Sequence, residues 1–193
     1  MVASAVPSEG KTTLVLNLSL ALADIGHRVV IVEADLRRPK LSTYLGLVGG
    51  VGLTNVLAGT AELDDVVQRY GDDEVFVLAS GPTPPNPGEL LASSHMQALI
   101  GKLRGQYDFV LVDVPPLLPV ADASGLAAHM DGVLMSVRYG TTRKEQLHQA
   151  AATITRVGGR TLGVVLNIVP SKARTAAAYG YDYTYNTGKH ASG

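Results

Sequence analysis

The sequence contains no cysteine and no tryptophan, and aromatic residues make up only 5% of it. The absence of cysteine excludes disulfides, thiolate metal sites and cysteine nucleophiles. No run of 18 or more apolar residues is present, so no segment is predicted to span a membrane. The first residues also lack the charged stretch and apolar run of a secretory signal.

Excess charge is also lacking, since the net charge of the 193 residues is -1. That value argues against a surface dedicated to nucleic acid, and no nucleic-acid partner is expected. The length and a hydrophobic content of 46% indicate an ordinary globular chain with a single domain. We expect this domain to occupy residues 1–172 and a flexible, polar, tyrosine-rich tail to occupy residues 173–193.

Short apolar runs rich in β-branched residues recur between helical patterns. The predicted strands are Arg28–Val32, Val75–Leu78, Phe109–Val112, Gly132–Val137 and Leu162–Leu166. The predicted helices are Thr12–Ala23, Leu53–Leu57, Leu63–Gln68, Gly88–Leu103, Ala121–His129 and Thr142–Val157. Continuous apolar strands are typical of a sheet covered on both faces. The alternation therefore predicts an α/β fold with a doubly wound, mostly parallel sheet.

A glycine-containing segment that opens an apolar helical pattern predicts a phosphate-binding loop, or P-loop. The segment is Ser8-Glu9-Gly10-Lys11-Thr12-Thr13, and we expect these residues to bind ATP with Mg²⁺. Backbone N–H groups of such a loop point at the phosphates, which Lys11 neutralises, while the Thr12 hydroxyl ligates the metal. Ala5 stands where the strict motif has its first glycine. Only Met1–Ser4 precede the loop, so we expect a truncated N-terminal strand.

Carboxylates follow two of the predicted strands. Glu33 and Asp35 come after Val32, and Asp113 comes after Val112. Ligands of an open α/β sheet lie beyond the carboxyl ends of its strands. We therefore expect Asp35 and Asp113 to place Mg²⁺, and Glu33 or Asp35 to accept a proton from an incoming nucleophile. The alternative for the aspartates is a helix cap or turn.

Three segments together resemble motifs of the bacterial tyrosine kinases of capsule and exopolysaccharide synthesis. Ser4–Thr13 resembles their Walker A motif, Ile31–Pro39 their Walker A′ motif and Val110–Pro116 their Walker B motif. The proline-rich segment Pro84–Leu91 and the tyrosine-rich tail match as well, so the resemblance covers almost the whole chain. It implies a fold related to the MinD/ParA-type ATPases. It also implies ATP-dependent autophosphorylation of tail tyrosines in trans, between protomers.

The resemblance assigns roles to individual positions. Lys11 and Thr12 match the residues that bind phosphate and Mg²⁺, and Asp35 and Asp113 match the metal-site acids. Glu33 stands where the family usually has an aspartate, the proposed base for the tyrosine hydroxyl, so the charge is kept and a methylene is added. The expected catalytic residues are therefore Lys11, Glu33, Asp35 and Asp113.

Two further features gain a role from the resemblance. Asn167 ends a predicted strand where related ATPases contact adenine; a turn residue closing the strand is the alternative. In the tail, tyrosines alternate with other residues and are the expected phosphoacceptors: Tyr179, Tyr181, Tyr183 and Tyr185. A disordered tail that associates non-specifically, or an amphipathic edge strand, would explain the same alternation without phosphorylation.

The resemblance also implies partners and a location. The expected partner is a membrane protein of the chain-length-determinant type, either a separate chain or an N-terminal part that precedes this segment. Contacts between tails and sites would form a homo-oligomer, and a cognate tyrosine phosphatase would reverse the reaction. The kinase would lie in the cytoplasm, at the inner face of the cell membrane. The oligomerisation motif of the family lies before the P-loop, so the resemblance does not extend to ring assembly.

Two other functions remain open at this stage. A MinD/ParA-like switch ATPase would hydrolyse ATP and recruit partners, but such proteins carry an additional lysine early in the P-loop, which Ser4–Pro7 lacks. A catalytically silent module that binds nucleotide and a membrane partner is the second alternative. The short N-terminal strand and the glutamate at position 33 favour that second function.

Overall fold

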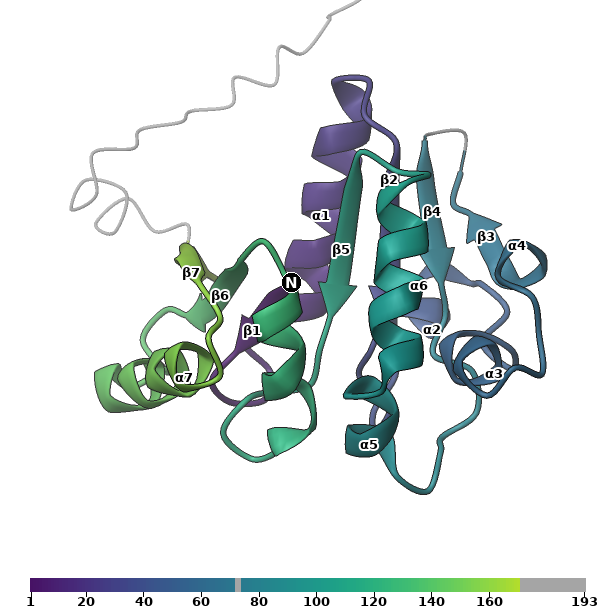
Figure 1. Cartoon of the computed structure of the whole chain (residues 1–193). Coiled ribbons are helices and arrows are strands. Elements are labelled where there is room, and N and C mark those ends of the chain that lie inside the picture. Colours follow the sequence, from purple (N-terminus) through teal and green to yellow (C-terminus); the bar gives the residue numbers. More distant parts are fainter. Residues whose placement is uncertain (72–73, 171–193) are drawn as a thin grey trace, which may run out of the picture.

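A seven-stranded sheet forms the middle layer of the molecule, with helices on both faces (Figure 1). The computed structural model describes residues 1–71 and 74–170. The strands are β1 Val2–Ser4, β2 Val29–Glu33, β3 Val67–Arg69, β4 Val75–Leu78, β5 Phe109–Asp113, β6 Val133–Arg138 and β7 Thr161–Asn167. Their order is β3-β4-β2-β5-β1-β6-β7, with β3 antiparallel to β4 and all other pairs parallel. The prediction of a doubly wound, mostly parallel sheet is confirmed.

The helices divide between two apolar cores, one on each face of the sheet. They are α1 Lys11–Asp24, α2 Leu41–Leu45, α3 Leu53–Leu57, α4 Leu63–Val66, α5 Pro87–Leu91, α6 Ser94–Arg104, the 3₁₀ helix η1 Ala121–His129 and α7 Lys144–Arg156. Helices α1 and α2 pack on one face, and α3 to α7 with η1 pack on the other. Apolar cover on both faces explains why the central strands β2 and β4 read as unbroken apolar runs.

Three sequence predictions of helices need correction. The helix predicted at Leu63–Gln68 ends at Val66, where the chain turns into β3. The helix predicted at Gly88–Leu103 is two helices, because Ser93 caps a new one by accepting a hydrogen bond from the Met96 N–H at 3.2 Å. The segment Ala121–His129 is helical but has 3₁₀ geometry. Helix α2 was not predicted.

The short strand β1 lies in the interior of the sheet, between β5 and β6, despite its three residues. Val2, Ala3 and Ser4 are at most 1% exposed and align with Leu134, Met135 and Ser136 of β6. On the other side, Val2 aligns with Asp113 of β5. Burial between two parallel neighbours fixes the point from which the P-loop begins, and it places Asp113 next to that loop.

Candidate nucleotide-binding site

The P-loop connects β1 to α1, and its glycine serves two purposes. Gly10 has φ 77°, in the left-handed region, and it directly precedes the first turn of α1. A Cβ atom at this position would lie 2.2 Å from Asn167 Nδ2. The backbone conformation and the close neighbour therefore both require glycine here.

The buried side chain of Glu9 stabilises the conformation of the P-loop through hydrogen bonds. This side chain is 1% exposed, and its carboxylate accepts hydrogen bonds from the Val6 N–H at 3.0 Å and from the Thr142 hydroxyl. The Ser136 hydroxyl donates to the Glu9 carbonyl at 2.6 Å. Glu9 lies in the predicted phosphate-binding segment, and the structure shows its carboxylate engaged with the protein itself.

Lys11 and Thr12 converge on Asp113. Lys11 Nζ lies 2.5 Å from Asp113 Oδ1, and the Thr12 hydroxyl donates to Asp113 Oδ2 at 2.8 Å. Both charged side chains are buried, at 8% exposure for Lys11 and 2% for Asp113. Each oxygen of one carboxylate thus contacts a different residue of the P-loop, as the sequence motifs led us to expect for a shared site.

Asp35 lines the pocket that the P-loop residues form, and burial disfavours its charged form. Burial raises the pKa of its carboxyl above the usual range of an aspartate, against the opposing effect of the Lys11 charge. The Arg38 N–H donates to Asp35 Oδ1 at 3.2 Å, as in a turn, so this predicted alternative role of Asp35 is also present. A carboxylate with a raised pKa at the rim of a pocket is a candidate proton acceptor.

Glu33 is placed differently from Asp35. Its carboxylate is 1% exposed and accepts three backbone hydrogen bonds, from Lys40 at 2.7 Å, Leu41 at 2.6 Å and Ser80 at 3.2 Å. Glu33 is not among the residues that line the pocket. Its contacts join the end of β2 to the start of α2 and to the chain after β4, which is a positioning role that the sequence did not reveal.

The pocket itself has a volume of about 700 Å³, within the range of small-molecule sites. Its floor is the P-loop and the start of α1, and its other walls carry three cationic residues and three prolines. These residues are Arg37, Arg38, Lys40, Pro115, Pro116 and Pro119. Tyr44, which is 63% exposed, also lines the pocket, as do Val120 and Ile168. Cations around a P-loop fit a polyanionic ligand such as a nucleoside triphosphate.

The donor set also fits Mg²⁺, which takes few protein ligands and completes its shell with phosphate oxygens and water. Thr12 and Asp113 are the protein groups that would hold it, while Asp35, which the sequence also suggested as a ligand, lines the same pocket. Within residues 1–71 and 74–170, no group of three histidine, cysteine, aspartate or glutamate side chains could bind a metal by itself. One carboxylate and one hydroxyl, completed by phosphate oxygens and water, form a donor set that suits a nucleotide-bound Mg²⁺.

Asn167 lies at the edge of the loop. Its side-chain amide donates to the carbonyl oxygens of Glu9 at 3.3 Å and Gly10 at 3.1 Å. These bonds tie the end of β7 to the P-loop, and the adenine contact stays a prediction. The other predicted residues of the loop, Ser8 and Thr13, both line the pocket. The four predicted phosphoacceptor tyrosines lie outside the described residues.

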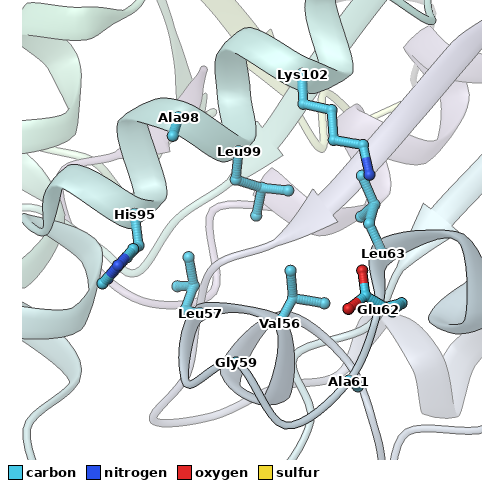
Figure 2. Close-up of a pocket in the computed structure, with 10 residues that line it drawn as sticks. All are labelled: Val56, Leu57, Gly59, Ala61, Glu62, Leu63, His95, Ala98, Leu99 and Lys102. Atoms are coloured by element: carbon cyan, nitrogen blue, oxygen red, sulfur yellow. The ribbon is translucent and has the colours of Figure 1, made fainter.

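A second, smaller pocket of about 270 Å³ lies between α3 and α6, and it shares no lining residue with the nucleotide pocket. Figure 2 shows Leu99 of α6 facing Val56 and Leu57 of α3 across it. Lys102 and Glu62 stand at its margin (Figure 2). Its apolar walls hold no arrangement of groups for phosphoryl chemistry.

A P-loop that follows an interior strand of a mostly parallel sheet, with a lysine, a threonine and two aspartates around it, defines a P-loop nucleotide-binding protein. Residues 8–164 match the family described as an AAA domain. The tyrosine-protein kinase YwqD of Bacillus subtilis is 39% identical over 94% of this chain and 76% of its own length. The chain belongs to the family of bacterial tyrosine kinases.

Solved structures agree in fold. The kinase domain of the Escherichia coli tyrosine kinase Etk superposes with a TM-score of 0.87 at 32% identity, covering 96% of this chain and 71% of that one. The cell division ATPase MinD of Pyrococcus furiosus follows with a TM-score of 0.72 at 27% identity, covering 94% and 80%. The predicted relation to MinD-type ATPases is therefore confirmed. None of the helices among the described residues is long and apolar enough to cross a bilayer.

Proposed function

We propose that the chain is an ATP-dependent protein-tyrosine kinase that phosphorylates the tyrosine cluster of its own tail, in trans. The observation that carries the proposal is the convergence of Lys11 and Thr12 on buried Asp113, with Asp35 on the adjoining pocket wall. Phosphoryl transfer depends mainly on positioning and charge stabilisation around a metal nucleotide, and these residues are of the types that supply both.

In the proposed reaction, Lys11 and the N–H groups of the P-loop bind the triphosphate, and Thr12 and Asp113 hold Mg²⁺. Bound Mg²⁺ neutralises charge on the phosphate oxygens. The tyrosine oxygen forms a bond to the γ-phosphorus as the bond from that phosphorus to the bridging oxygen of ADP breaks. The phenolic proton passes to a carboxylate, and ADP leaves.

We assign the proton acceptor to Asp35 rather than to Glu33. Asp35 lines the pocket, and its raised pKa makes it a stronger base than an ordinary carboxylate. Glu33 is buried, and three backbone N–H groups already occupy its oxygens. In this assignment Glu33 acts by positioning the turn that carries Asp35.

The cellular role proposed for the kinase is the regulation of polysaccharide synthesis and export at the inner face of the cell membrane. It rests on membership of the family, whose relatives include tyrosine-protein kinases named CapB and CpsD. A chain-length-determinant type membrane protein is the proposed partner. A cognate tyrosine phosphatase would return the tail to its unmodified state.

The test is incubation of the protein with ATP and Mg²⁺, followed by mass spectrometry to locate phosphate. Phosphotyrosine within Tyr179–Tyr185 that disappears in Lys11→Ala supports the kinase. Phosphate release without phosphotyrosine would instead indicate a switch ATPase of the MinD type. Nucleotide binding with neither product would indicate a silent module. Circular dichroism of Lys11→Ala checks that the variant is folded, because Asp113 loses its buried partner.

A further inference from the structure

Two residues of the nucleotide pocket have a backbone conformation that their side chains disfavour. Within residues 1–71 and 74–170, the non-glycine residues with positive φ are Ser8, at 66°, and Ile168, at 56°. Both line the pocket. Such a conformation persists only where surrounding contacts impose it. Residues strained in this way cluster at ligand-binding sites, and Ile168 is the less tolerant of the two because its Cβ is branched.

Asn167 ties Ile168 to the P-loop. Its side-chain Oδ1 accepts a hydrogen bond from the Ile168 N–H at 2.9 Å. Its Nδ2 donates to the carbonyl oxygens of Glu9 at 3.3 Å and Gly10 at 3.1 Å. The main chain is fixed as well, because the Tyr139 N–H donates to the Asn167 carbonyl at 2.9 Å. Both polar atoms of the Asn167 amide are thus engaged within the protein, and the neighbouring side chain that lines the pocket is that of Ile168.

The side chain of Ile168 reaches the P-loop and is only half covered there. A Cβ atom placed on Gly10 would lie 3.6 Å from Ile168 Cδ1. The residue is nevertheless 49% exposed. The protein therefore holds an apolar side chain in a strained conformation at the wall of a pocket, with surface left that a ligand can bury.

The pocket differs in chemistry between its two sides. The P-loop lies in the middle, because β1 stands between β5 and β6 in the strand order. On the side of β5 and β2, Asp113 accepts the Thr12 hydroxyl, and the lining includes Asp35 and the three cationic residues. On the side of β6 and β7, Ile168 is the described residue that lines the pocket. A nucleotide has the same polarity, with charged phosphates at one end and an uncharged, flat base at the other.

We propose that Ile168 provides apolar cover for the base of the bound nucleotide. The inference rests on the proposed function, which places a nucleoside triphosphate in this pocket. Contact with the base removes apolar surface of both groups from water, which favours binding. The bond from Asn167 sets the orientation of Ile168 before the ligand arrives, so binding does not have to order this residue.

The test compares two ligands of the full-length chain in the presence of Mg²⁺. One is an ATP analogue with an imido group in the β,γ-bridge, which resists hydrolysis, and the other is inorganic tripolyphosphate, which has no base. Isothermal titration calorimetry of the parent should give the lower Kd for the analogue. Ile168→Gly should raise the Kd of the analogue about tenfold, as expected for loss of an apolar side chain from a contact. The Kd of tripolyphosphate should not change.

Val169→Gly is the matched control. Val169 is the next residue along the chain and is 43% exposed, but it is not among the described residues that line the pocket. The same kind of substitution should therefore leave both dissociation constants unchanged. Thermal unfolding provides a second measurement, in which Ile168→Gly should be no less stable than the parent, because glycine adopts the left-handed conformation without strain.

Equal losses of affinity for the two ligands would show that Ile168 acts on the P-loop, and would overturn the contact with the base. An unchanged Kd of the analogue in Ile168→Gly would overturn it too. A parent that binds the two ligands equally well contradicts this inference alone. A parent that binds neither contradicts the proposed function as well.

Discussion

Lys11 Nζ and Asp113 Oδ1 lie 2.5 Å apart in the interior, at the point where the P-loop meets the end of β5. The other oxygen of Asp113 accepts the hydroxyl of Thr12. One carboxylate therefore orients both the cation and the hydroxyl that a magnesium nucleotide requires. Asp113 is a structural support of the loop as well as a metal ligand in the proposed reaction.

Replacing Asp113 with alanine should lower the free energy of unfolding by about 3–5 kcal/mol, because Lys11 keeps its charge in the interior without its partner. Urea denaturation without nucleotide measures this effect. The matched control is Lys11→Met combined with Asp113→Leu, which removes both charges and should recover most of the loss. A single Asp113→Ala variant as stable as the parent would contradict the buried ion pair.

Asp35→Asn should stabilise the protein at neutral pH while abolishing phosphorylation of the tail. Burial raises the pKa of Asp35, so the folded state keeps this proton to a higher pH than the unfolded chain. Stability is therefore lost as pH rises through the interval between the two pKa values, and the full penalty applies at neutral pH. Asparagine removes that penalty.

The measurement is the midpoint of urea unfolding for Asp35→Asn and the parent over a series of pH values. The difference between the two should shrink as pH falls toward 3.8, where Asp35 of the unfolded chain also gains its proton. An asparagine variant that is less stable than the parent at neutral pH would show that the ionised carboxylate is favoured by its surroundings.

Glu33→Gln should weaken the fold and reduce tail labelling without changing the pH dependence of labelling. An amide offers one acceptor oxygen where three backbone N–H groups now donate to a carboxylate. Loss of such charge-assisted bonds costs about 1.5–3 kcal/mol. Labelling rates measured over pH distinguish the two acids, since a base changes the profile and a positioning residue does not. A lost pH dependence in Glu33→Gln would return the role of base to Glu33.

Gly10→Ala should abolish nucleotide binding, because the new methyl group would collide with Asn167 Nδ2 in a backbone conformation that disfavours alanine. Adding Asn167→Ala removes the collision and leaves a conformational cost of about 1–2 kcal/mol. Titration with a fluorescent ATP analogue should therefore show partial recovery in the double variant. Asn167→Ala alone is the matched control. No recovery would mean that the backbone conformation alone decides the outcome.

The sequence was sufficient to predict the layers of the fold and to identify residues that the fold brings together at one pocket. Apolar runs and the P-loop motif are local signals, and Lys11, Thr12, Asp35 and Asp113 do meet in or beside one pocket. The strand β3 escaped prediction because its three residues continue a helical pattern, and only pairing with β4 makes them extended.

The positioning role of Glu33 also could not be predicted from the sequence. Its spacing from Asp35 suggested two carboxylates at one site, whereas its partners Lys40, Leu41 and Ser80 are brought to it by the fold. Glu9 is similar, because the Thr142 hydroxyl comes from a loop more than a hundred residues away. Contacts between distant segments decide whether a buried carboxylate supports the backbone or faces a ligand.

The interior position of β1, between β5 and β6, has a mechanical consequence. Strands β3, β4, β2 and β5 lie to one side of β1 in the strand order, and β6 and β7 lie to the other. The three residues of β1 therefore form the seam, the junction that joins the two halves of the sheet. A nucleotide held by the P-loop, by Asp113 of β5 and by a loop tied to Asn167 of β7 would span that seam. Binding should therefore make the two halves unfold as one cooperative unit, with a sharper thermal transition than that of the protein alone.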